Sequence, residues 1–329
     1  MKNFIHYIMK NVTLAFFILL MANIMPAFGQ AEAMNERIIT NLEYPSTGGQ
    51  LIKAVLSMPK GKGPFPIIVT IHGGKGDRSI EYLRTLAVAS EVSETVTMLN
   101  KESWAVLAIS YRDGAIFKEE EEDVVAGIRF AKSLPGIDPA RVGLLGGSHG
   151  GMLALRASIL LGNEICCVGV GSPWMTNPKT VLLSDVTAPP MSLLSPKALE
   201  WQIETFRKPL LRTLERMYPS RGAIEVLLTE KSIEENVAKI QVPILFITSL
   251  ADIQVPHILV KPTIEKLIAI GKNITVYTAK ESLHGFYWGR SLDGGAREDA
   301  GPKSTVQLFE ESNARAEILN FFKRCFTKS

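Results

Sequence analysis

Apolar runs of strand length alternate with helix-like segments along most of this 329-residue chain. Runs that are apolar throughout are typical of parallel strands covered on both faces. An antiparallel hairpin is expected first, at 37–44 and 51–58, around a turn at 45–49. The order predicts an α/β fold: a mostly parallel central sheet with helices on both faces. Later strands are expected at 67–71, 105–110, 142–146, 168–171, 244–248 and 274–277, and helices at 79–96, 119–133, 152–161 and 262–270.

The first 29 residues have the pattern of a secretory signal peptide. Lys2 and Lys10 precede an apolar run at 12–25, and small residues suited to cleavage follow at 26–30. The run is shorter than the roughly twenty residues that a spanning helix needs. We expect cleavage after Gly29, export to the periplasm or outside the cell, and no stable membrane insertion. An uncleaved membrane anchor is the alternative.

Composition favours a globular domain over 30–329 with a small-molecule or peptide substrate. Hydrophobic residues make up 46% of the chain and charged residues 21%, which allows a sizeable core. The formal charge of +3 is spread without a basic block, and no nucleic-acid-binding motif is present. Nucleic acid is therefore not an expected partner.

Cysteine usage argues against a disulfide framework, because the chain has three cysteines and two are adjacent. Cys166 and Cys167 lie in an apolar stretch, where neighbours in a strand point to opposite faces, and both are expected to pack as small buried side chains. Cys325 is the remaining thiol. The cysteines and histidines show no metal-ligand spacing.

A serine lies between glycines where the expected strand 142–146 meets a helix. The residues read Gly-Gly-Ser148-His149-Gly-Gly, so glycines stand two before and two after the serine. A sharp strand-to-helix turn forces the serine into a strained conformation, and the glycines leave room for neighbouring chain. We therefore expect Ser148 to be a nucleophile. The alternative is a glycine-rich turn with an incidental serine.

A serine hydroxyl needs a histidine base to act as a nucleophile. The chain has five histidines, and four of them can be set aside. His6 lies in the expected signal peptide, and His149 is held in the turn beside the serine. His72 lies in an earlier loop, and His257 stands at the entry to a helix as an expected surface or capping residue. His284 is left, in a loop after strand 274–277, where catalytic groups of open α/β sheets gather.

The base needs a carboxylate, and Asp252 is the expected one because it ends the strand region at 242–252. The chain order serine, aspartate, histidine agrees with this assignment. Asp185 and Asp293 are rivals, but the first lies in an insertion and the second follows the histidine. A helix N-cap is the structural alternative for Asp252.

Backbone amides are expected to bind the oxyanion of the tetrahedral intermediate. Strand 67–71 runs into His72-Gly73-Gly74, where glycines let an amide approach a substrate carbonyl. The predicted donors are the amide of His149 and one from Gly73 or Gly74. A tight turn without this role is the alternative.

Residues 172–235 interrupt the alternation and are expected to form a helical lid insertion. Helix-like pieces occur around 198–206 and 210–218. Under this hypothesis Trp174, Met175 and Trp201 line an acyl pocket. The alternative is an ordinary helical excursion whose apolar residues pack a core.

Together these motifs resemble the α/β-hydrolases, and in particular prolyl oligopeptidase catalytic domains and dienelactone hydrolase-like esterases. The points of likeness are His72-Gly-Gly, the doubled glycine after Ser148, and Ser-Leu-His284-Gly-Phe. Prolyl oligopeptidases carry a β-propeller before this domain, for which this chain has no room. Dienelactone hydrolases use a cysteine nucleophile where this chain has serine. The resemblance therefore implies a stand-alone serine esterase.

The implied reaction is acyl transfer to Ser148 and hydrolysis of the acyl-enzyme by a water that His284 activates. This chemistry needs no cofactor or metal, and its expected partner is a small-molecule ester or a short peptide. One alternative is a secreted prolyl oligopeptidase-like peptidase. Another is a hydrolase-fold binding protein without catalysis. The sequence leaves the substrate and the oligomeric state open.

Overall fold

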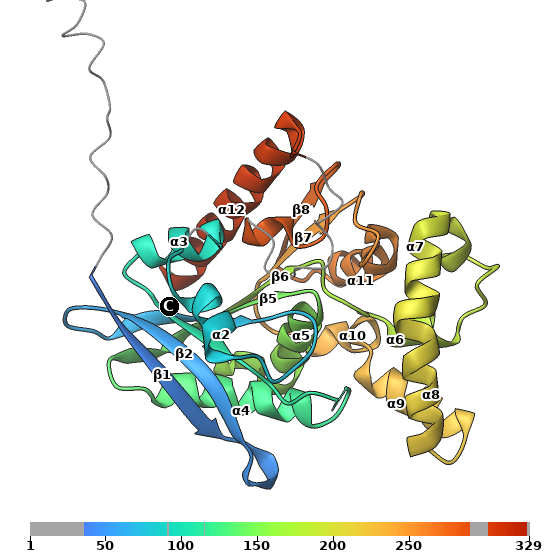
Figure 1. Cartoon of the computed structure of the whole chain (residues 1–329), viewed down its shortest axis with the longest axis horizontal. Helices are drawn as coiled ribbons and strands as arrows, with labels where there is room; N and C mark the ends of the chain where they lie inside the picture. Colours follow the sequence, from blue (N-terminus) through green and yellow to red (C-terminus); the bar gives the residue numbers. More distant parts are fainter. Residues whose placement is uncertain (1–35, 91, 115, 290–301, 328–329) are drawn as a thin grey trace, which may run out of the picture. The chain divides into compact units, whose positions relative to one another are not determined.

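The computed structural model describes residues 36–90, 92–114, 116–289 and 302–327 (Figure 1). The expected signal peptide at 1–29, with His6, lies outside these residues, and so does Asp293. Within the described ranges, no helix has the length and apolar character needed to cross a membrane.

A central sheet of eight strands organises the described chain, in the order β1-β2-β4-β3-β5-β6-β7-β8. The expected hairpin forms its antiparallel edge, since β1 pairs with β2 and β2 pairs antiparallel with β4. All later pairings are parallel, as the apolar runs predicted. The strands are β1 (Arg37–Pro45), β2 (Leu51–Pro59), β3 (Phe65–Ile71), β4 (Ala105–Ile109), β5 (Ile137–Gly147), β6 (Cys167–Gly171), β7 (Ile244–Ser249) and β8 (Ile274–Ala279).

Helices cover both faces of the sheet, and each face has its own core (Figure 1). Along β3, Ile67 and Val69 belong to one core and Ile68 to the other, as the two-residue period of a strand requires. α4 (Glu119–Ser133), α5 (His149–Leu161) and α11 (His257–Ala269) pack on the first core. α2 (Ile80–Ala87), α3 (Glu94–Lys101) and α12 (Thr305–Phe326) pack on the second.

Three expected helices have different bounds in the structure. The helix expected at 152–161 is α5, which begins three residues earlier, at His149. The helix expected at 79–96 is two helices, α2 and α3, because the chain is extended at Val88 and each helix has its own serine N-cap, Ser79 and Ser93. The helix expected at 262–270 begins at His257, so Pro262 lies inside α11. Proline at the first turn is the commoner position, which is why the sequence placed the start there.

The insertion between β6 and β7 is helical, as predicted, and extends to one side of the sheet (Figure 1). One run of helix covers residues 196–217, with a wider turn at Gln202–Arg207 between its two regular parts. The insertion contains α6 (Pro178–Leu183), α7 (Pro196–Trp201), α8 (Lys208–Met217), α9 (Arg221–Lys231) and the start of α10 (Ile233–Asn236).

The cysteines do not all lie as expected. Cys167 is buried at the start of β6, but Cys166 precedes the strand in a bend and is half-buried. Strand alternation therefore does not apply to this pair, and the two Sγ atoms lie 3.7 Å apart instead of on opposite faces.

Candidate functional site

Ser148 occupies the predicted turn between β5 and α5. Its φ of 53° and ψ of −120° are a backbone conformation that L-residues rarely adopt. Hydrogen bonds hold it there: the Ser148 amide donates to the Gly171 carbonyl of β6 at 2.8 Å, and the Trp174 amide donates to the Ser148 carbonyl at 3.0 Å. The strained serine is thus fixed between two strand ends.

Glycines around the serine are required by close backbone approach. A Cβ on Gly146 would lie 2.2 Å from the Gly150 carbonyl oxygen. A Cβ on Gly150 would lie 2.2 Å from the carbonyl oxygen of Ile71 and 2.3 Å from that of His72. The glycine spacing read from the sequence therefore brings the turn against the end of β3.

His284 and Asp252 form a buried pair. His284 Nδ1 lies 2.8 Å from Asp252 Oδ2, and both side chains are almost wholly inaccessible to solvent. The other carboxylate oxygen accepts hydrogen bonds from the amides of Gln254 and Val255, each at 2.9 Å. Asp252 is not a helix N-cap, because α11 begins at His257 after Pro256. A neutral imidazole that donates from Nδ1 to a carboxylate is the tautomer whose Nε2 carries a lone pair.

Glu310 of α12 fixes the loop that carries His284, a role that sequence reasoning missed. Its carboxylate accepts hydrogen bonds from the amides of Lys280 at 2.6 Å and Ser282 at 2.9 Å, and from the Ser282 hydroxyl at 2.7 Å. Burial raises the pKa of Glu310, but these hydrogen bonds outweigh it, and the net shift is downward. The signal was weak, because nothing in the sequence marks one glutamate of a long helix as a loop anchor.

The rival residues that the structure describes have other partners. His257 begins α11 with Nδ1 2.9 Å from Thr248 Oγ1, and burial lowers its pKa. His72 is buried with Nδ1 3.0 Å from the Gly73 carbonyl oxygen, and burial lowers its pKa to about 3. Asp185 accepts hydrogen bonds from Thr187 within an exposed turn. None of the three lines the cavity that contains Ser148.

The backbone amides of Gly73, Gly74 and His149 donate to no described residue. The His149 amide is the first of α5 and has no partner within the helix. Gly74 lines the cavity at the serine, whereas Gly73 does not. The Gly74 carbonyl accepts a hydrogen bond from the Tyr111 hydroxyl at 3.0 Å, and this contact holds the backbone at Gly74 in place. Of the two glycines predicted as alternative donors, Gly74 is therefore the one that reaches the cavity.

Ser148 and His284 line one cavity of about 510 Å³ between the sheet and the insertion. Of the three residues expected in the acyl pocket, Trp174 and Trp201 line this cavity, whereas Met175 does not and is buried in the first core. The cavity wall beside the Ser148 turn is polar, and the wall formed by the insertion is mostly apolar. Further lining residues are Lys75, Arg78, Asp113 and Gln254 among the polar side chains, and Ile116, Phe206, Pro209 and Leu210 among the apolar ones.

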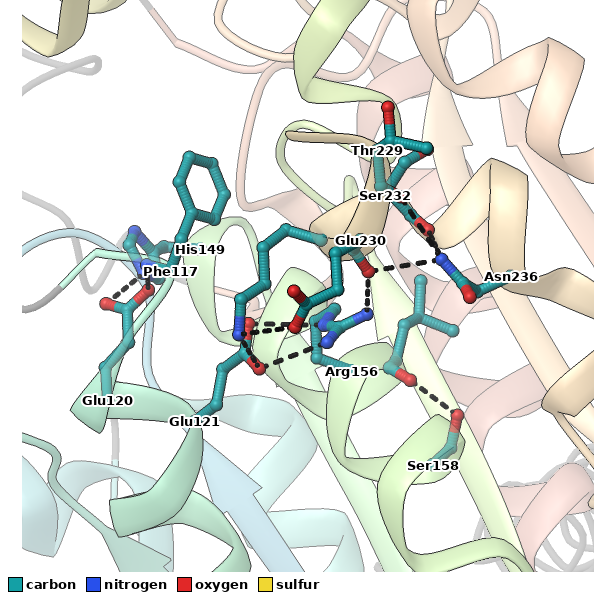
Figure 2. A network of polar contacts seen from close by, with 12 residues as sticks. Phe117, Glu120, Glu121, His149, Arg156, Ser158, Thr229, Glu230, Ser232 and Asn236 are labelled. Atoms are coloured by element: carbon teal, nitrogen blue, oxygen red, sulfur yellow. Dashed lines mark hydrogen bonds and ion pairs between the residues drawn. The ribbon is translucent and has the colours of Figure 1, made fainter. Parts of the chain in front are cut away.

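A second histidine–carboxylate pair borders the same cavity. His149 Nε2 lies 2.9 Å from Glu120 Oε2, and both residues line the cavity wall (Figure 2). Sequence reasoning placed His149 in the turn for its amide alone and gave Glu120 no role. Among the described residues, no group of three or more histidine, cysteine, aspartate or glutamate side chains could hold a metal ion.

Comparison with known proteins agrees with this architecture. A protein-family model described as BD-FAE matches residues 55–167, which include Ser148 but neither Asp252 nor His284. Mitochondrial acyl-coenzyme A thioesterase 2 of Mus musculus is 28% identical over 148 residues, and its Rattus norvegicus counterpart is 27% identical over 151. The matched region covers 44% of this chain and only 30% of either curated relative.

Solved structures extend the likeness to most of the chain. A Pyrobaculum calidifontis esterase superposes with a TM-score of 0.60 at 18% identity, covering 87% of this chain and 85% of its own. An acetyl xylan esterase from Paenibacillus gives 0.61 at 17%, covering 90% and 86%. An acylaminoacyl peptidase of Pyrococcus horikoshii gives 0.62 at 15%, covering 89% of this chain but 42% of its own. The described chain has the α/β-hydrolase fold.

Proposed function

We propose that this protein hydrolyses carboxylic esters of small substrates, with Ser148 as nucleophile, His284 as general base and Asp252 as the carboxylate that orients it. The observation that carries the proposal is the convergence of a strained serine and a carboxylate-paired histidine on one cavity. Such a pair can take the serine proton during attack and return it to the leaving alcohol.

Each residue has a defined task in the proposed reaction. Ser148 Oγ attacks the ester carbonyl, and the amides of His149 and Gly74 bind the oxyanion. His284 then protonates the leaving alcohol and activates a water that releases the acyl group. Asp252 stabilises the imidazolium through the 2.8 Å contact to Nδ1. Trp201 and Phe206 of the insertion are proposed to hold the acyl group.

The extent of the structural match supports esters rather than peptides as the proposed substrates. Most of this chain superposes on 85% or more of each esterase but on less than half of the peptidase. We infer that the protein acts after export, as the sequence at 1–29 suggests. Thioesters share the acyl-enzyme chemistry and belong in the substrate panel, since the curated relatives are named as thioesterases.

Labelling by a fluorophosphonate probe tests the nucleophile directly. The wild-type protein should be labelled at Ser148, and Ser148→Ala should abolish labelling and reduce ester turnover by at least about a thousandfold. His284→Ala and Asp252→Asn should slow labelling while the fold, followed by circular dichroism, is kept. Wild-type turnover by Ser148→Ala would overturn the mechanism. A panel of matched esters, thioesters and aminoacyl amides would separate an esterase from a peptidase.

A further inference from the structure

The Glu120–His149 pair on the cavity wall is fixed by several contacts. Glu120 is 1% exposed, and its two oxygens have separate partners: Oε1 accepts the Phe117 amide at 3.0 Å, and Oε2 lies 2.9 Å from His149 Nε2 (Figure 2). The carboxylate therefore has a fixed orientation, with one oxygen assigned to the backbone and the other to the imidazole.

The plane of the His149 ring is fixed by its aromatic neighbours. The Tyr111 ring lies nearly parallel to it at 5.5 Å and 17°, and the Trp174 ring at 4.9 Å and 22°. With its plane set by stacking and Nε2 set by Glu120, the imidazole has one polar atom left. Nδ1 has no hydrogen-bond partner among the described residues, although the ring lines the cavity beside Ser148.

The partner of Nε2 determines the chemistry of Nδ1. An ionised carboxylate only accepts hydrogen bonds, so the proton of a neutral His149 is on Nε2. Nδ1 then carries a lone pair and acts as a hydrogen-bond acceptor toward the cavity. A substrate hydroxyl can donate to it, whereas a substrate carbonyl oxygen would face lone pair against lone pair.

We propose that His149 Nδ1 is a specificity-determining acceptor that selects esters carrying a free hydroxyl close to the scissile bond. The inference rests on the proposed function, because it concerns the substrate of the same site. Lys75 and Arg78 on the cavity wall are donors only, whereas Asp113 and Gln254 also carry acceptor oxygens, which a change at Glu120 leaves unaltered. Glu120 is a positioning residue in this scheme: it acts through His149.

Glu120→Gln distinguishes the proposed specificity role from a merely structural one. The Phe117 amide should hold the glutamine carbonyl oxygen at the Oε1 position, which places the NH₂ group opposite His149 Nε2. The NH₂ group is a donor, so the imidazole proton must move to Nδ1. The acceptor in the cavity thereby becomes a donor while the shape of the site is kept.

The measurement is kcat/KM for methyl esters of pentanoic acid and of its hydroxy and oxo derivatives, substituted at carbon 2, 3 or 4. A hydroxyl can donate, and a ketone can only accept. At the carbon whose substituent contacts His149 Nδ1, the wild-type protein should prefer the hydroxy ester to the oxo ester. Glu120→Gln should lower that hydroxy-to-oxo ratio by about fivefold or more, the effect of one hydrogen bond worth about 1 kcal/mol. Intrinsic ester reactivity cancels, because the same substrates are compared between two enzymes.

Glu119→Gln is the matched control, since it makes the same change in the same turn of α4 and Glu119 does not contact His149. It should leave the ratio unchanged. A ratio that Glu120→Gln leaves unchanged at all three positions, with Ser148 still labelled by the fluorophosphonate, would overturn the specificity role and leave the proposed function standing. Failure of the wild-type protein to label would count against the proposed function itself.

Discussion

Gly150 lies so close to the end of β3 that it has no room for a side chain. The contacts are to the carbonyl oxygens of Ile71 and His72, which cannot move without distorting the strand that leads to the proposed oxyanion donors. The absence of a side chain at Gly150 thus allows the Ser148 turn to pack directly against the loop that carries the proposed oxyanion donor.

Gly150→Ala should lower the free energy of unfolding by about 1 to 3 kcal/mol, the usual cost of overpacking. It should also slow fluorophosphonate labelling of Ser148, because the turn and the end of β3 must separate. Gly222→Ala is the control: it also lies in a helix, but its Cβ would meet nothing closer than 3.8 Å. That change should raise stability by up to about 1 kcal/mol. Urea unfolding and probe labelling of both variants give the comparison, and equal effects would contradict it.

His72 makes stability depend on pH. Its pKa is lowered by burial to about 3, against 6.5 in the unfolded chain, so below pH 6.5 the unfolded state binds a proton that the folded state does not. Stability should therefore fall as pH decreases from 6.5 toward 3, by about 3 kcal/mol at pH 4 from this residue alone. His72→Asn, whose amide can still donate to the Gly73 carbonyl, should lose less stability between pH 7 and pH 4. Urea unfolding at both pH values checks this, and identical slopes would contradict it.

α12 contributes to the site from outside the cavity. It packs on the second core and places Glu310 under the loop that follows β8. The Glu310 carboxylate accepts five hydrogen bonds, two of them from Ser282, and these fix the loop two residues before His284. The helix therefore fixes the loop of the proposed base, His284, from outside the cavity.

Glu310→Gln should reduce kcat more than it changes KM, and lower the free energy of unfolding by about 1 to 3 kcal/mol at pH 7. The pKa of Glu310 is lowered in the folded protein, so its contribution is present above the unfolded pKa and is lost as pH falls through the folded value. Wild type and variant should therefore converge in stability on acidification. Glu317→Gln on the same helix is the control and should behave as wild type. Steady-state kinetics and urea unfolding at pH 7 and pH 4 test both effects.

Elements with a strong local signal were predictable from the sequence. The hairpin, the positions of the strands along the chain and the Ser148 turn follow from strand periodicity and glycine spacing, which depend on a few adjacent residues. α12 was not predicted, although its capping box at Ser304 and Gln307 is a recognisable start signal. The roles of Glu120 and Glu310 could not be predicted, because each depends on a partner from a different part of the chain. Met175 was misplaced for a similar reason: side-chain type does not reveal which side of the insertion faces the cavity.

A buried charge network joins the insertion to the rest of the molecule. Arg156 of α5 lies against Glu121 of α4, with both contacts at 3.2 Å, and also donates to the Glu230 carbonyl of α9 at 3.0 Å (Figure 2). Lys231 of α9 completes it with a 3.0 Å contact to Glu121. The helix that follows the nucleophile is thereby linked to the end of the insertion.

Arg156→Met should destabilise the protein by about 3 kcal/mol, because it leaves the buried Glu121 with one cation instead of two. It should also make residues 172–235 more sensitive to limited proteolysis. Arg129→Met removes an exposed pair with Glu164 and should cost less than about 1 kcal/mol. Proteolysis at the wild-type rate in Arg156→Met would show that the network does not hold the insertion.

The position of Glu310 late in the chain has a consequence for biosynthesis. During translation the nucleophile at 148 leaves the ribosome well before the carboxylate that anchors the His284 loop. The proposed active site is therefore completed only when α12 has been synthesised and has docked. A nascent or truncated chain that ends before residue 310 would carry an unsupported base, so hydrolytic activity would be delayed until the polypeptide is nearly finished.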